Sequence, residues 1–166
     1  MGSWAKCDFR QFKRLQDKLE RMQRKDMNAF CEAAAKELAA RLLAKVIKRT
    51  PVGEYKDGRI GGTLRKGWTA NSEGEAMYGA IFNGGAGGAS YARSLPINRV
   101  GDTYIIDIIN PVNYASYVEF GHRTRGHKGW VKGQFMLTKS EIELEVQAPK
   151  VLEKKILKYL GDIFND

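Results

Sequence analysis

The segment "AFCEAAAKELAARLLAKVIKR", residues 29–49, decides the fold, because it is the strongest helical pattern in the chain. It is rich in alanine and leucine, which are strong helix formers. Apolar side chains recur along it at helical spacing, at Phe30, Ala34, Leu38, Leu42 and Val46, with Cys31, Ala35 and Ala39 beside them. Pro51 ends the helix, since a residue that precedes proline avoids the α conformation. The pattern predicts a helix that packs on the chain's own sheet or on another subunit, and we favour the sheet.

The residues upstream of this segment also have a helical pattern. Asp8 and Gln11 have the spacing of a capping box, and Asp26 or Asn28 can cap a second helix. Residues 1–49 are therefore expected to form one long helix or a helix pair. The same region has basic residues but no apolar stretch of the kind that a secretory signal needs. We expect the protein in the cytoplasm of the cell that makes it.

The middle of the chain favours β-structure. Three runs are rich in β-branched and aromatic residues and are separated by glycine, asparagine and proline: "TLRKGWTAN" at 63–71, "EAMYGAIFN" at 75–83 and "TYIIDIIN" at 103–110. They predict a small antiparallel sheet of three to four strands. The glycine-rich segment 83–100 lacks the pattern of a phosphate loop, so we expect a mobile hairpin extension there.

A change of period marks the return to helix. Tyr114, Tyr117 and Val118 have helical spacing, and Gly121 ends this short helix. A loop follows, and the pattern is helical again from Phe135 onward.

The order of these elements predicts an α+β fold in a single domain that spans residues 1–166. Within it we expect a helical arm over 1–49, a sheet with the short helix and the glycine-rich loop over 50–136, and a C-terminal helix over 137–166.

The net charge of +9 is concentrated in two regions. Residues 1–49 hold 13 Lys or Arg against 6 Asp or Glu, and residues 111–140 hold 5 against 1. This imbalance favours an acidic partner, which is either protein or nucleic acid. No stretch approaches the roughly 18 apolar residues of a membrane span. Cys7 and Cys31 match no metal-ligand spacing.

The sequence lacks the patterns of a catalytic centre. No Ser-His-Asp order, nucleophile elbow or Cys-His pair occurs. Glu119, His122 and His127 could supply three zinc ligands only if the loop folded back on itself, and the cationic side chains between them would repel the ion. We expect no catalytic, metal or cofactor site, and hence no enzyme.

Short motifs in a fixed order give a more specific signal. They are T-P-V at residues 50–52, G-x-L-R-x-x-W at 62–68, Y-A-x-Y-V-E-F-G at 114–121 and F-M at 135–136. In this order and spacing the chain resembles the tail-component family typified by gene product ten of the HK-type siphophages. The resemblance covers nearly the whole chain. The glycine-rich insertion at 83–100 departs from the family pattern, so no contacts are carried over there.

The resemblance implies a non-enzymatic virion protein with an α+β fold, encoded by a phage or a prophage. It further implies a position at the head–tail junction, as a tail-completion or neck subunit. Such proteins assemble as rings, often hexamers, and contact other neck or tail proteins. The protein would reside in the virion, and in the bacterial cytoplasm during assembly.

The segment 121–133 is the candidate contact element. Arginine and large aromatic side chains are enriched at protein interfaces, and Trp130 would be the apolar anchor. We expect this loop to project from the short helix and to order on assembly; the alternative is that Trp130 folds back as local core. Glu119 can also pair with Arg65 inside the subunit. The candidate interface comprises Arg65, Trp68, Glu119, Phe120, His122, Arg123, Arg125, Lys128 and Trp130.

A basic DNA-binding protein is the alternative function. Cationic side chains alternate here with Tyr114, Tyr117, Phe120 and Trp130, and together they can follow phosphates while the rings stack on bases. The spacing of Tyr114 and Tyr117 equally fits anchors of the short helix, and no known DNA-binding motif appears.

Overall fold

A computed structural model of the protein describes Lys13, Asp17, Glu20 and residues 25–54, 61–69 and 95–165. The α+β class is confirmed, with a long helix on either side of short strands. The elements are α2 (Lys25–Arg49), α3 (Thr63–Lys66), β1 (Asn98–Val100), β2 (Thr103–Ile105), α6 (Ala115–Phe120), β3 (Gly121–Arg123), β4 (Trp130–Lys132) and α7 (Met136–Asn165). The expected capping box at Asp8 and the expected strand at 75–83 lie outside the described residues.

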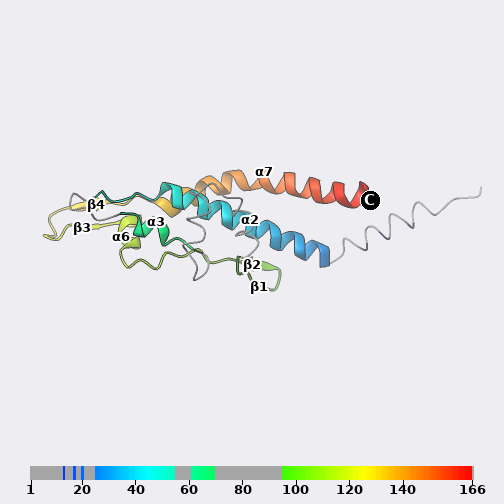
Figure 1. Ribbon diagram of the computed structural model, residues 1–166, viewed down its shortest axis with the longest axis horizontal. Coiled ribbons are helices and arrows are strands. Elements are labelled where there is room, and N and C mark those ends of the chain that lie inside the picture. Colours follow the sequence, from blue (N-terminus) through cyan, green and yellow to red (C-terminus); the bar gives the residue numbers. More distant parts are fainter. Residues whose placement is uncertain are drawn as a thin grey trace, which may run out of the picture.

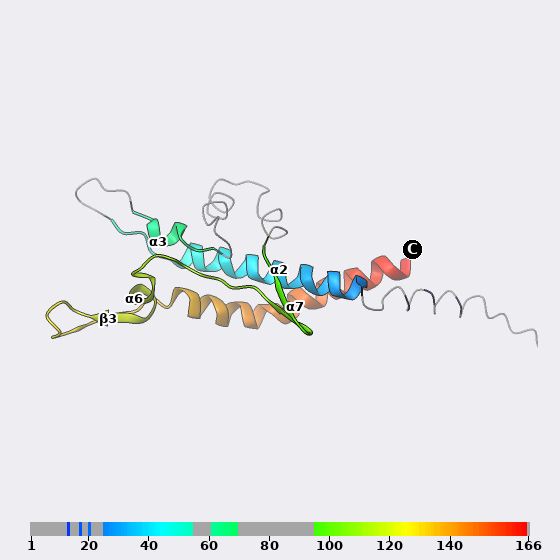
Figure 2. The same cartoon turned by 90° about the horizontal axis from the view of Figure 1, so that it is seen from below.

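Two long helices, α2 and α7, lie side by side and give the described part an elongated shape (Figure 1). Ion pairs show that they run antiparallel. Nζ of Lys155 lies 2.7 Å from the Glu37 carboxylate, whereas a guanidinium nitrogen of Arg49 lies 2.8 Å from that of Glu143. The β3–β4 strands lie at one end of this helix pair, and the C-terminus lies at the other (Figures 1 and 2).

The core lies where α2 meets α3, the segment 106–118 and the start of α7. Its buried apolar members are Ala39, Leu43, Val46, Ile47, Leu64, Trp68, Leu95 and Met136. Leu38 and Leu42, which we expected in the buried stripe of α2, are only half-buried and face Tyr104 and its neighbours. Residues spaced by four drift around a helix that has 3.6 residues per turn, so the buried face moves from Leu42 to Leu43.

The strands of the described residues form two separate antiparallel pairs. In one pair Asn98 stands opposite Ile105, and in the other Gly121 stands opposite Lys132. The segment 63–71 was expected as a strand, but its described part, residues 63–69, begins with helix α3 and contributes an isolated bridge between Thr69 and Ile109. Helix α3 is fixed by the Asn110 amide, which donates a hydrogen bond of 2.8 Å to the Leu64 carbonyl oxygen.

Candidate assembly surface

Thr50 is the centre of a buried hydrogen-bonded cluster at the C-terminal end of α2. Its hydroxyl donates to the Val46 carbonyl at 2.7 Å and accepts from Nε1 of Trp68 at 2.8 Å. Nε of Arg65 donates to the Thr50 carbonyl at 2.8 Å. The T-P-V and L-R-x-x-W motifs therefore join α2 to α3. Trp68, only 4% exposed, and Arg65 both act inside the subunit here.

Glu119 is also an interior residue, with 5% exposure. Its carboxylate accepts hydrogen bonds from the backbone N–H groups of Leu137 and Thr138, both at 3.0 Å, and from the Thr138 hydroxyl at 2.9 Å. The first N–H groups of a helix have no partner within the helix, and a negative charge at this end is favourable. Phe135, which precedes α7, has no side-chain acceptor, so Glu119 caps α7 from a distance.

The chain closes on itself between α6 and α7. Backbone N–H groups of Gln134 and Phe135 donate to the carbonyls of Val118 and Glu119 at 2.8 and 3.0 Å. Gly133 lies so close to the end of α6 that a Cβ there would be 2.3 Å from the Glu119 carbonyl oxygen. Residues 121–132 thus leave α6 and return to it, as a hairpin that projects from the helix pair (Figure 2).

The hairpin of residues 121–132 is folded within the single chain. Arg123 pairs with Trp130 across the two strands, and the backbone N–H of Thr124 donates a hydrogen bond to the Gly129 carbonyl at the tip. The expectation that this segment becomes ordered only on assembly is therefore wrong, because its two strands already pair in the single chain. Trp130 is 63% exposed, so it is no part of a local core. Its Nε1 lies 2.9 Å from the place of a Cβ on Gly121, which means that the indole lies over this glycine.

The pairing gives the hairpin two different faces. Arg123, Trp130 and Lys132 share one face, because residues directly opposite each other point the same way. His122 and Val131 share the other, and the His122 ring lies 5.8 Å from that of Tyr117. One face is cationic with a large ring, whereas the other carries a histidine and an aliphatic side chain.

The structure separates the predicted interface residues into two groups. Arg65, Trp68 and Glu119 hold the subunit together. The exposed group on or beside the hairpin comprises Phe120, Arg123, Arg125, Lys128 and Trp130, with His122 half-buried next to them. The exposed residues that the prediction omitted include Tyr117, Val131 and Lys132. Strand alternation from Gly121 would have identified the last two, had the hairpin been recognised.

Other kinds of site receive no support from the described residues. Among them no group of three histidine, cysteine, aspartate or glutamate side chains is placed to hold a metal ion. None of their helices has the length and apolar character that a membrane crossing requires.

Comparison with known proteins identifies the class of protein. A family model described as "Bacteriophage HK97-gp10, putative tail-component" matches residues 13–121. The chain belongs to this family of phage tail components. The match includes the Thr50 cluster and Glu119 and ends at Gly121, so most of the hairpin and all of α7 lie beyond it. No curated protein and no solved structure matches the chain.

Proposed function

We propose that the protein is a structural subunit of the phage head–tail junction, which completes or caps the tail. It acts through contacts with other copies of itself, assembled as a ring, and with neighbouring neck or tail proteins. It has no catalytic role. Its family membership supports a place in the tail, and the family resemblance of its motifs supports the junction and the ring.

The exposed hairpin carries this proposal. Trp130 and Phe120 are 63% and 61% exposed, although rings of this size are usually buried. Trp130 stands directly opposite Arg123 in the hairpin, and tryptophan and arginine are among the residues that most often dominate binding energy at protein interfaces. Because the hairpin is already folded, little conformational entropy is lost when it binds. Its surface is therefore suited to burial against another polypeptide.

A double substitution tests the proposal. Trp130→Ala with Arg123→Ala removes the anchor and its paired cation from one face of the hairpin. We expect a folded protein that fails to join tails to heads, and a fall in infectious titre of at least about tenfold, since a hot-spot residue contributes about 2 kcal/mol or more. The measurement is complementation of a phage that lacks the gene, together with electron microscopy of the particles.

The control is the other exposed hairpin of the described chain. Arg99→Ala with Val100→Ala also removes an arginine and an exposed apolar residue, here from β1. This variant should support assembly as the wild type does. Normal joining by the Trp130 and Arg123 variant, at equal protein level and equal melting temperature, would contradict the proposal.

DNA contact is a second candidate function, and the same surface supports it. Tyr117, Phe120 and Trp130 are all exposed beside cationic side chains, which is the composition of a stacking platform for single strands. Phosphate-driven binding weakens steeply with salt. Strong binding of DNA oligonucleotides at low salt that is lost in the Trp130 and Arg123 variant would favour this function over assembly.

A further inference from the structure

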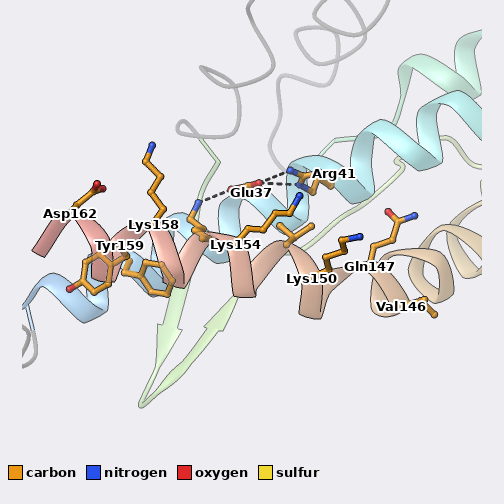
Figure 3. Close-up of a pocket in the computed structure, with 12 residues that line it drawn as sticks. Glu37, Arg41, Val146, Gln147, Lys150, Lys154, Lys158, Tyr159 and Asp162 are labelled. Atoms are coloured by element: carbon orange, nitrogen blue, oxygen red, sulfur yellow. Dashed lines mark hydrogen bonds and ion pairs between the residues drawn. The ribbon is translucent and has the colours of Figure 1, made fainter. Parts of the chain in front are cut away.

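A groove edged by lysine side chains lies between α2 and α7 (Figure 3). It has a volume of about 760 Å³. Lys150, Lys154 and Lys158 follow one another along α7, one helical turn apart, and line it. We call this surface the lysine groove. Its lining contains five basic side chains against two acidic ones, so it suits an acidic ligand.

Two of the basic residues in the groove already have an acidic partner within the chain. Glu37 on α2 accepts hydrogen bonds from Lys155 and from Arg41, both at 2.7 Å (Figure 3). Among the described residues, the three lysines of the rim have no ion-pair partner. Like charges four residues apart on a helix repel each other and destabilise it by about 0.2–0.5 kcal/mol per pair. The rim therefore gains from an acidic partner.

The N-terminal half of α7 carries the complementary charge. Glu141 and Glu145 are exposed, stand four residues apart, and have no ion-pair partner among the described residues. They too repel each other. We call them the acidic edge. Glu143 between them is different, because its carboxylate binds Lys45 and Arg49 on α2, which lowers its pKa.

Exposed apolar side chains run between these two charged surfaces. Ile142, Val146 and Leu157 are 58%, 77% and 61% exposed on α7. At about 100° per residue they lie between the acidic edge on one side and the lysine rim on the other, and Val146 itself lines the lysine groove. Aliphatic side chains gain nothing from contact with the charged backbone of a nucleic acid, whereas their burial against another helix is favourable. The stripe thus favours a protein ligand over a polyanion, although Glu153 interrupts it.

We propose that α7 forms a contact between copies of this chain, in which the acidic edge of one copy lies along the lysine groove of the next. This inference rests on the self-assembly proposed above. The acidic edge and the groove are different surfaces on opposite sides of the helix, so the contact is heterologous. Each copy gives its acidic edge to one neighbour and its groove to the other, which is the arrangement that closes into a ring.

Charge exchange tests this contact. Glu141→Lys with Glu145→Lys places lysines against the lysine rim, and Lys154→Glu with Lys158→Glu places acids against the acidic edge. Each double variant should weaken self-association by about tenfold or more, because like charges then face each other. The fourfold variant that combines them restores opposite charges and should associate nearly as the wild type does. The readouts are oligomer mass in solution and copies retained per tail.

A matched control changes the same charge elsewhere. Asp102→Lys with Asp107→Lys alters two exposed acids near β2 and should leave self-association unchanged. Failure of the fourfold variant to recover, with its fold intact by circular dichroism, would overturn the contact. If the Lys154→Glu, Lys158→Glu variant lost duplex DNA binding but kept its oligomer mass, that result would also overturn the contact. Normal infection by a phage that lacks the gene would instead overturn the proposed function itself.

Discussion

At the scale of single residues, Glu119 shows how this family motif holds the subunit together. A buried carboxylate is costly unless hydrogen bonds satisfy it. Glu119 meets this condition by binding the first turn of α7, with three donors from Leu137 and Thr138. The residue thus links the end of α6 to the start of α7, and the hairpin projects from this junction.

Replacing Glu119 tests the link. Glu119→Ala leaves two backbone N–H groups and a hydroxyl without their acceptor, so we expect a loss of about 1–3 kcal/mol in the free energy of unfolding. Glu119→Gln keeps one carbonyl acceptor and should lose less. Denaturant unfolding followed by circular dichroism gives both values. A Glu119→Ala protein as stable as the wild type would show that the cap contributes nothing.

Sequence reasoning identified Glu119 and Trp68 as notable but expected them at an interface. Their actual partners are 18 positions away in the chain, at Leu137 and at Thr50. Local spacing cannot reveal such a partner, because only the tertiary fold brings the two segments together. Trp130 differs, since its side chain is exposed, and its role at an interface stays a prediction.

At the scale of elements, the long helices were predictable and the hairpin was not. Apolar side chains recur at helical spacing in α2 and α7, and this local pattern specifies a helix. Pro51 predicted the end of α2 and Gly121 the end of α6, and these helices end at Arg49 and Phe120. The hairpin contains glycines and cations with little alternation. One end of it continues directly from α6, and the returning end is held there by the hydrogen bond from the Gln134 N–H to the Val118 carbonyl. A loop interpretation was therefore the natural one from sequence.

The pairing of α2 with α7 predicts a pH dependence. Hydrogen bonds from Lys155 and then from Arg41 hold the pKa of Glu37 below its ordinary value of 4.5. A group whose pKa is lowered on folding stabilises the protein above its unfolded value, and this contribution is lost as the pH falls through the folded value. The contribution of Glu37 is thus complete near pH 7 and fades as the solution is acidified below 4.5.

Glu37→Gln should therefore lower stability at neutral pH and have a smaller effect in acid. The difference in unfolding free energy between wild type and variant, measured in denaturant at about pH 7 and about pH 3, should shrink at the lower pH. Glu54→Gln, at an exposed position, provides the control. A difference that stays constant with pH would show that the ion pairs of Glu37 do not contribute through its charge.

At the scale of the whole molecule, two candidate surfaces lie in different places. The hairpin forms one end of the helix pair, and the lysine groove runs along its length (Figures 1 and 3). A ring subunit needs lateral contacts with its neighbours and further contacts with what lies above or below the ring. In the proposed ring, the α7 surfaces would make the lateral contacts, and the projecting hairpin would contact an adjoining neck or tail protein.

The most direct measurement is the accessibility of the hairpin tip before and after assembly. Gly126→Cys places a thiol where a Cβ meets no atom within 4 Å, in a background with Cys7→Ser and Cys31→Ser. Maleimide should label it rapidly in the isolated subunit and slowly in tails joined to heads, and denaturing the particles should restore labelling. Equal labelling rates in subunit and particle would contradict the claim that this hairpin is buried against another protein.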